Sequence, residues 1–188
     1  HGIEGCLADV KSSEEDIHKS RECVKLVFQN LPNLILNPDD IDARQNTSLA
    51  AYYGGNAINK QLAGYVHAFA HSIGAIYHIP HGKAIALCLI PIVSFHKKNC
   101  MDKLAKLSVY CGFSKDTDEN AAAADHFIAA LEGLLKKCGF ERGCDLIDEK
   151  DYEKLTNMIN ADSINYSPPK TLSNKEIVRL LNEIKNGR

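Results

Sequence analysis

The sequence lacks several features that would assign it to a particular class of protein. It contains no tryptophan, no C-x-x-C pair among its 7 cysteines and no G-x-G-x-x-G motif. No apolar run approaches the roughly 20 residues that a membrane helix requires, and no signal peptide is recognisable at the start. We therefore expect neither a zinc knuckle, nor a redox pair, nor a Rossmann-type nucleotide site, nor a membrane span in this sequence.

An excess of charge of one sign is also missing. Lys and Arg number 22 and Asp and Glu 24, which gives a net charge of −2. A nucleic-acid-binding surface would require clustered basic residues, so we expect no nucleic-acid partner. Hydrophobic residues make up 45% of the 188 residues, enough for the core of one folded domain. We predict a single cytoplasmic domain over residues 1–188 without a membrane partner.

The cysteines also fit the predicted cytoplasmic location. They are odd in number and widely scattered, whereas a secreted disulfide framework is normally even in number and concentrated in a small chain. Most lie in apolar helical stretches, so we interpret them as buried thiols that pack as small hydrophobic groups. They are Cys6, Cys23, Cys88, Cys100, Cys111, Cys138 and Cys144.

Hydrophobic periodicity indicates helices nearly throughout and no alternating strand. The fold class is therefore predicted to be all-α, a single domain of about eight helices. Pro91 lies within an apolar run that could be a buried strand, but a proline at its centre favours a kinked helix. The expected segments are 12–31, 38–62, 64–77, 82–97, 102–110, 120–137, 148–160 and 173 to the end.

Capping residues set the expected helix ends. Ser12 and Glu15 form an S-x-x-E capping box, and Ser173 with Glu176 forms another. The pair Leu31–Pro32 is predicted to end the first helix, and Asn37 to cap the second, with Pro38 in its first turn. Gly112 and Gly139 occupy C-terminal stop positions, and Pro80 stops the central helix.

Three of the 8 histidines fall within a short stretch of the chain, at His67, His71 and His81. His67 and His71 are four residues apart, which places them on one face of a helix. His81 follows a break forced by Pro80, where the chain can turn back toward them. Imidazole binds Fe, Zn, Cu and Ni, but ordinary histidines bonded to backbone carbonyls would give the same spacing. Spacing alone leaves both interpretations open.

The surrounding residues are more specific. Residues 64–74 read G-x-x-H-x-x-A-H-x-x-G and are followed by P-H-G at 80–82. This pattern resembles the signature of the iron-containing (group III) alcohol dehydrogenase family, and every fixed position is filled. The segment 83–91 is similar to the family's continuation. The opening His1-Gly2-Ile3-Glu4-Gly5 resembles a further segment in which a ligand Asp precedes a ligand His by four residues.

The resemblance implies an all-α C-terminal domain that binds metal and substrate. It implies that His67 and His81 are metal ligands, that His1 is a third, and that an Asp before the first residue is the fourth. His71 would face the substrate and the nicotinamide instead of the metal, as a catalytic and cofactor-binding residue. The implied cofactors are Fe²⁺, with Zn²⁺ as the alternative, and NAD(P) held by a separate N-terminal domain. The implied partner is a small alcohol or aldehyde; a homo-oligomer is left open.

Other residues near the motif receive weaker interpretations. His78 is interpreted as a polar residue lining the site, and Phe69 and Tyr77 either as pocket residues or, more commonly at helical spacing, as core. His18, His96 and His126 are expected to be solvated.

The nucleotide-binding half of such an enzyme is absent from this sequence, which would make this piece inactive alone. Two alternatives therefore stay open. One is a non-catalytic helical domain for metal binding or subunit contact. The other is a zinc-dependent polyol dehydrogenase of the same superfamily.

Overall fold

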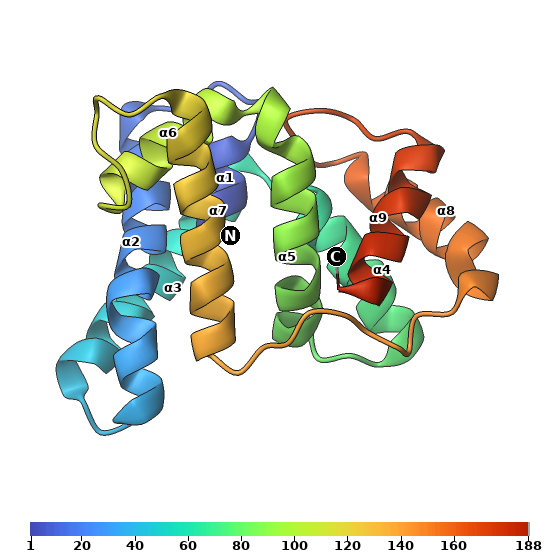
Figure 1. Cartoon of the computed structure of the whole chain (residues 1–188), viewed down its shortest axis with the longest axis horizontal. Coiled ribbons are helices and arrows are strands. Elements are labelled where there is room, and N and C mark those ends of the chain that lie inside the picture. Colours follow the sequence, from blue (N-terminus) through green and yellow to red (C-terminus); the bar gives the residue numbers. More distant parts are fainter. Residues whose placement is uncertain (188) are drawn as a thin grey trace.

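The computed structural model describes residues 1–187, which form helices and connecting loops with no strand in that range (Figure 1). The predicted all-α class is confirmed, with nine α-helices in the described residues where about eight were expected. The α-helices are α1 (Gly2–Leu7), α2 (Glu14–Leu36), α3 (Ile41–Gln61), α4 (Tyr65–Tyr77), α5 (His81–His96), α6 (Met101–Tyr110), α7 (Asn120–Lys137), α8 (Tyr152–Ser163) and α9 (Asn174–Asn186); two short 3₁₀ turns, η1 (Lys97–Asn99) and η2 (Glu149–Asp151), complete the set.

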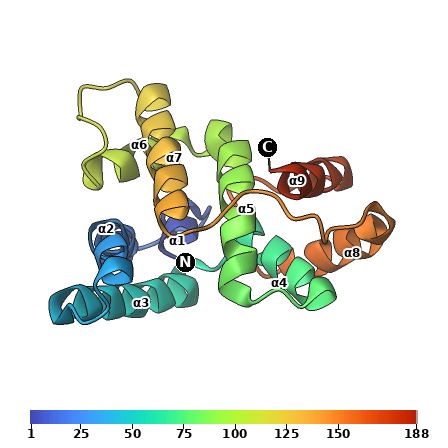
Figure 2. The same cartoon turned by 60° about the horizontal axis from the view of Figure 1, so that its bottom comes forward.

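Helix α5 runs between two hydrophobic cores, as Figures 1 and 2 show. Its residues Cys88 and Ile92 belong to a core built with α4, α8 and α9. Its residues Ile90 and Val93 belong to a second core built with α1, α2, α6 and α7. The apolar run that predicts α5 is thus explained, because both sides of this helix are covered by other helices. Pro91 lies inside the helix, so the prediction of a helix instead of a strand is confirmed.

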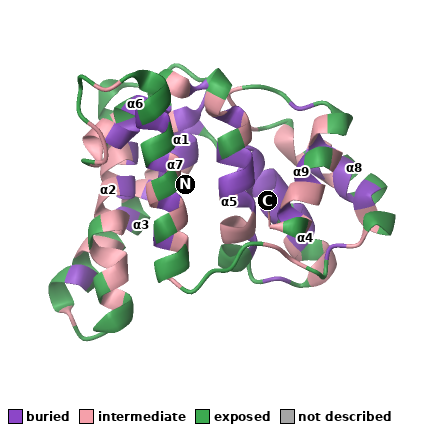
Figure 3. Ribbon diagram, in the orientation of Figure 1, coloured by how far each residue is buried: buried purple, intermediate pink, exposed green. Residues whose placement is uncertain are grey.

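Helix α4 is the most buried part of the first core. Val66, Phe69 and Ile73 are each exposed by 2% or less, and Figure 3 shows the buried residues concentrated on α4 and α5. The prediction of a central helix over 64–77 is confirmed. Its N-terminus lies beside α1, which places the start of the chain against the histidine motif.

The predicted end of the first helix at Leu31–Pro32 is wrong. Helix α2 continues through Pro32 to Leu36, although a proline cannot donate to the carbonyl one turn earlier. The helix persists because its last turn is closed by a hydrogen bond from Asn37 N to the carbonyl of Asn33 (2.8 Å). The Asn33 side chain also donates to Asp40 Oδ2 (2.6 Å), which ties this end to α3.

The capping residues of α2 and α3 also differ from the prediction. Ser13, and not Ser12, caps α2 by accepting from Asp16 N. Asp40, and not Asn37, caps α3 by accepting from Ala43 N. In both cases the chosen residue is the last one in an extended conformation before the helix, which is what a side-chain cap requires.

The other predicted signals for helix starts and ends are confirmed. The Ser173–Glu176 capping box at α9 is complete. Gly112 and Gly139 follow α6 and α7 with positive φ angles of 81° and 76°. The short helix α1 was not predicted, because six residues are too few to show a periodicity. Within residues 1–187, no single helix has the length and apolar character to cross a membrane, and α5 with η1 meets that test only together with α6, across a bend of 117°.

Candidate metal centre

Three imidazoles from separate parts of the chain meet at the N-terminal end of α5. His1 immediately precedes α1, His67 lies in the first turn of α4, and His81 is the first residue of α5. One ring nitrogen from each lies within 4.8 Å of the other two. The rings of His1 and His67 stack with centroids 4.7 Å apart. The structure therefore brings together the three residues that the resemblance implied as ligands, while their ligation of a metal stays a prediction.

The turn between α4 and α5 returns His81 to the end of α4 that carries His67. His78 closes α4 in the left-handed conformation (φ 54°), and Pro80 precedes the first residue of α5. A Cβ atom on Gly74 would lie 3.1 Å from the carbonyl oxygen of Ile79. The fixed glycine of the motif thus lets this connection pack tightly against α4.

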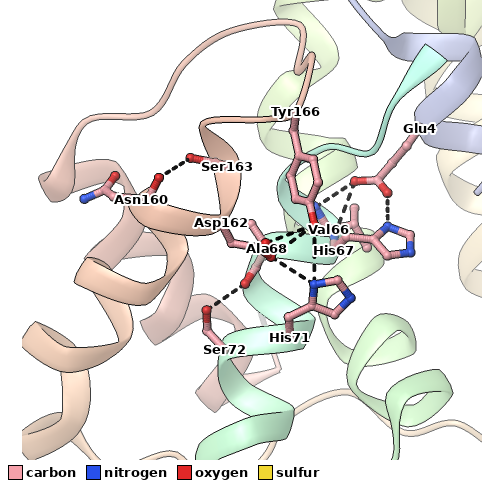
Figure 4. Close-up of polar contacts among 10 residues, drawn as sticks. All are labelled: Glu4, Val66, His67, Ala68, His71, Ser72, Asn160, Asp162, Ser163 and Tyr166. Carbon is pink, nitrogen blue, oxygen red and sulfur yellow. Dashed lines mark hydrogen bonds and ion pairs between the residues drawn. The ribbon is translucent and has the colours of Figure 1, made fainter. Parts of the chain in front are cut away.

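His67 is held by a buried carboxylate from α1 (Figure 4). Glu4 is only 8% exposed, and its Oε2 atom is hydrogen-bonded to Nδ1 of His67. Its other oxygen, Oε1, accepts from the backbone N–H groups of Val66 (2.9 Å) and His67 (3.4 Å). Glu4 therefore contacts both the ring of His67 and the N-terminus of the helix that carries it.

The other ring nitrogen of His67, Nε2, is buried and has no hydrogen-bond partner among residues 1–187. A buried polar atom without a partner costs free energy, and such atoms are uncommon in native proteins. A divalent cation placed among the three imidazoles would supply that partner, since imidazole nitrogen is a good ligand for Fe²⁺ and Zn²⁺. The residues present therefore fit a metal of this kind.

The environment of His81 favours the form of imidazole that binds metal. Burial, followed by the neighbouring His67 and His71, lowers the pKa of His81 below its usual value. A protonated imidazole has no lone pair for a metal, so a lowered pKa keeps a ligand available at neutral pH.

His71 lies one turn beyond His67 and has different partners. Its Nδ1 atom is 2.9 Å from Oδ2 of Asp162, at the end of α8. The hydroxyl of Tyr166 donates to both oxygens of Asp162 (3.1 and 3.2 Å) and lies 3.4 Å from the same ring nitrogen. Figure 4 shows the three side chains converging. The ring of His71 still lies close to the other imidazoles, with centroids 5.6 Å from His67 and 5.3 Å from His81. Its assignment to the substrate and nicotinamide instead of the metal stays a prediction.

All four histidines line one open cleft with a volume of about 440 Å³. Its wall is mixed in character, since it combines imidazoles and a phenol with aliphatic groups from the end of α3 and the residues that follow it. This combination suits a small molecule that has one polar atom and a short apolar body. The remaining lining residues are Ile58, Leu62, Ala63, Asn165 and Tyr166.

The pocket interpretation of Phe69 and Tyr77 is wrong. Phe69 is fully buried in the core, and the Tyr77 hydroxyl is hydrogen-bonded to Asp151 and to the backbone of Asp148. Neither side chain lines the cleft. His78 is exposed and is not part of the cleft wall.

His96 was expected to be solvated, and this expectation is wrong. The residue is only 3% exposed, and in the part of the chain that the structure describes neither ring nitrogen has a hydrogen-bond partner. Its ring stacks on Tyr65, because the last turn of α5 reaches into the core. Burial, followed by the charge of Lys170, lowers the pKa of His96 to about 4. His18 and His126 are exposed, as predicted.

The prediction for the cysteines is largely confirmed. All seven are free thiols, and each is buried or half-buried. Burial raises the pKa of Cys6 and Cys111 to about 12 and that of Cys100 to about 11. Thiols with such high pKa values are poor nucleophiles and poor metal ligands at neutral pH.

Three residues at the site were not found from the sequence. Glu4 had one available signal, since it lies three residues after His1 and a short helix would place both on one side. Asp162 and Tyr166 lie far from the motif in the sequence, next to a proline-rich loop. Only the packing of α8 against α4 brings them to His71, so no local pattern could have indicated them.

Comparison with known proteins identifies the family to which the chain belongs. Residues 1–185 match the sequence profile of the Fe-containing alcohol dehydrogenase family, C-terminal domain. The chain is 27% identical over 183 residues to the NAD-dependent methanol dehydrogenase of Bacillus methanolicus, covering 96% of this chain and 48% of that protein. It is 28% identical over 164 residues to the 1,3-propanediol dehydrogenase of Citrobacter freundii, covering 86% of this chain and 42% of that protein.

Solved structures agree with the fold. The crystal structure of a 1,3-propanediol oxidoreductase superposes with a TM-score of 0.91 at 25% identity, covering 98% of this chain and 48% of that one. An alcohol dehydrogenase from Oenococcus oeni superposes with a TM-score of 0.90 at 24% identity, covering 97% of this chain and 48% of that one. The chain thus spans about half the length of the proteins it matches. It belongs to the Fe-containing alcohol dehydrogenase family and corresponds to the C-terminal domain of that family.

Proposed function

We propose that this chain is the metal- and substrate-binding part of an NAD(P)-dependent alcohol dehydrogenase. In this proposal His1, His67 and His81 hold Fe²⁺, or alternatively Zn²⁺. The observation that carries the proposal is the buried, unpartnered Nε2 atom of His67 beside the ligand atoms of the other two histidines. When bound, the metal supplies a Lewis acid that polarises an alcohol or aldehyde oxygen and lowers the pKa of the alcohol.

The cleft residues orient the substrate. Ile58, Leu62 and Ala63 give an apolar wall for a short carbon chain, while the histidines lie on the side where the substrate oxygen would bind. The names of the relatives, which act on methanol or 1,3-propanediol, support a small alcohol or aldehyde as the substrate class.

His71 would hold or move a proton near the substrate oxygen. Its Nδ1 atom is engaged by Asp162, so its Nε2 atom is the one available to the substrate. Because the carboxylate fixes which nitrogen carries the proton, the ring keeps one orientation toward the cleft. The proposal also places His71 beside the nicotinamide.

NAD(P) binding is assigned to a part of the protein outside these 188 residues. The support is that the chain spans about half of each relative it matches and contains no glycine-rich nucleotide motif. The fourth ligand, an Asp preceding His1 by four residues, is assigned there as well. A cytoplasmic location, a possible homo-oligomer and the absence of nucleic-acid and membrane partners stay predictions.

A second candidate is a non-catalytic helical domain that binds metal or mediates subunit contact. A zinc-dependent polyol dehydrogenase is a third candidate with the same site. Activity with NAD⁺ or NADP⁺ and a set of short alcohols and polyols, measured on the protein in its full natural length, distinguishes these three.

The metal site is tested by calorimetric titration of this chain with Zn²⁺. We expect His67→Ala and His81→Ala each to weaken binding by more than the about 10- to 100-fold typical of losing an outer-shell partner. His126→Ala, an exposed histidine far from the cleft, is the matched control. If both ligand variants bind Zn²⁺ as tightly as the parent chain, the proposed site is wrong.

A further inference from the structure

We infer that Glu4 is a positioning residue that fixes the ring of His67 in the form that binds metal. Specifically, Glu4 holds the proton of His67 on Nδ1, so that the lone pair of Nε2 faces His1 and His81. This inference rests on the metal site of the proposed function and assigns a role to a residue outside the ligand set.

The first step is the hydrogen bond between the two side chains. Oε2 of Glu4 is bonded to Nδ1 of His67, and both side chains are buried, at 8% and 6% exposure. An ionised carboxylate only accepts hydrogen bonds, so Nδ1 must be the donor. In a neutral imidazole the other nitrogen then carries the lone pair. That nitrogen is the unpartnered Nε2 atom.

The second step is that Glu4 cannot easily turn away. Its Oε1 atom accepts from the N–H groups of Val66 and His67, which lie in the first turn of α4. These N–H groups have no partner within the helix, and Gly64 at the N-cap offers no side chain to satisfy them. Glu4 therefore replaces the missing cap from another helix, and its negative charge is favourable at this helix end.

The third step is the space that this arrangement requires. A Cβ atom on Gly64 would lie 2.8 Å from Oε1 of Glu4, closer than such atoms approach in proteins. The backbone at Gly64 has a negative φ of −140°, so alanine is conformationally allowed there. The glycine that opens the histidine motif is thus explained by the carboxylate that must fit against it.

The decisive variant is Glu4→Gln, which keeps the shape and removes one acceptor. A glutamine amide has one oxygen and one NH₂ group, whereas every neighbour of Glu4 described above is a donor. If the oxygen stays with the helix N–H groups, the NH₂ group faces His67 and moves the ring proton to Nε2. We expect the fold to be retained, Zn²⁺ affinity to fall by about 10- to 100-fold, and the ¹⁵N spectrum to show His67 protonated on Nε2.

The matched control is Glu176→Gln, because Glu176 also bonds a helix N-terminus, at α9, with no histidine involved. It should lose some stability and leave Zn²⁺ affinity unchanged. The tautomer of His67 is read by ¹H–¹⁵N correlation of the imidazoles, assigned by comparison with His67→Ala.

Two results overturn the inference. One is that His67 keeps its proton on Nδ1 in Glu4→Gln. The other is that Glu4→Gln binds Zn²⁺ as tightly as the parent while His67→Ala does not. If neither the parent nor any variant binds Zn²⁺, the proposed function fails, and the inferred metal-binding role of Glu4 fails with it. The tautomer measurement then still decides whether Glu4 determines which nitrogen of His67 carries the proton.

Discussion

Nδ1 of His71 and Oδ2 of Asp162 lie 2.9 Å apart, although 91 positions separate the two residues in the chain. The first lies on α4 and the second near the end of α8, so the contact depends on how these helices pack. Tyr166 extends the contact by donating to the same carboxylate. A carboxylate bonded to one nitrogen of an imidazole fixes the direction of the other.

This relationship gives a prediction for catalysis. Asp162→Asn should lower kcat for alcohol oxidation by about tenfold or more and change KM less, because His71 loses the partner that sets its proton. Tyr166→Phe removes only one hydroxyl and should have a smaller effect. Steady-state kinetics of the natural full-length protein check this, and equal kcat values for Asp162→Asn and the unmodified protein would exclude a role for the pair.

A second prediction separates His71 from the ligand set. His71→Ala should retain Zn²⁺ binding within a few-fold of the parent chain, whereas His81→Ala should not. The reason is that the ligand atom of His81 lies within 4.8 Å of those of His1 and His67, a group of ligand atoms that does not include His71. Calorimetric titration measures both variants. A loss of equal size in the two would place His71 among the ligands.

A third prediction concerns pH and the buried His96. Its pKa is about 4 in the fold, below the roughly 6.5 of an unfolded histidine. The unfolded state therefore binds a proton first, and stability falls as pH decreases from about 6.5 toward 4. Between pH 7 and pH 5 this histidine should remove about 2 kcal/mol from the free energy of unfolding.

Urea unfolding of the parent and of His96→Leu at the two pH values measures this contribution. The leucine variant should lose less stability on acidification than the parent. His78→Asn, which replaces an exposed histidine with a residue that tolerates positive φ, should behave like the parent. Identical pH dependence in the parent and His96→Leu would contradict the prediction.

A fourth prediction compares two glycines. Gly64→Ala should destabilise the fold by about 1–3 kcal/mol, because its Cβ atom would displace the Glu4 carboxylate. It should also weaken Zn²⁺ binding. Gly55→Ala should instead stabilise by about 0.5–1 kcal/mol, since Gly55 lies inside α3 with no atom within 4 Å of the added Cβ. Thermal melts of both variants test the contrast, and a stable Gly64→Ala with normal Zn²⁺ affinity would count against the space argument.

The sequence predicted the parts of this domain that local patterns encode. The motif within residues 64–82 led to His67, His71 and His81 through its resemblance to a family signature. The Ser173–Glu176 pair correctly marked the start of α9. These features depend on residues close together in the chain, where helix geometry relates spacing to position.

Long-range packing decided what the sequence could not predict. Pro32 would end an isolated helix, but α2 continues because its last turn is closed and bonded to the start of α3. His96 resembles a solvated residue at the end of an apolar helix, yet the core surrounds it. Asp162 reaches His71 only because α8 packs on α4.

The position of α5 between the two cores has a consequence for how the site holds together. His1 leads into α1, which belongs to one core, and His67 belongs to α4 in the other, while His81 starts the helix that they share. Any ligand that binds all three imidazoles therefore connects the two cores across their boundary. Such a ligand stabilises the packing of the two cores against each other instead of either core alone. The reason is that the complete set of nitrogens exists only when the cores are packed together.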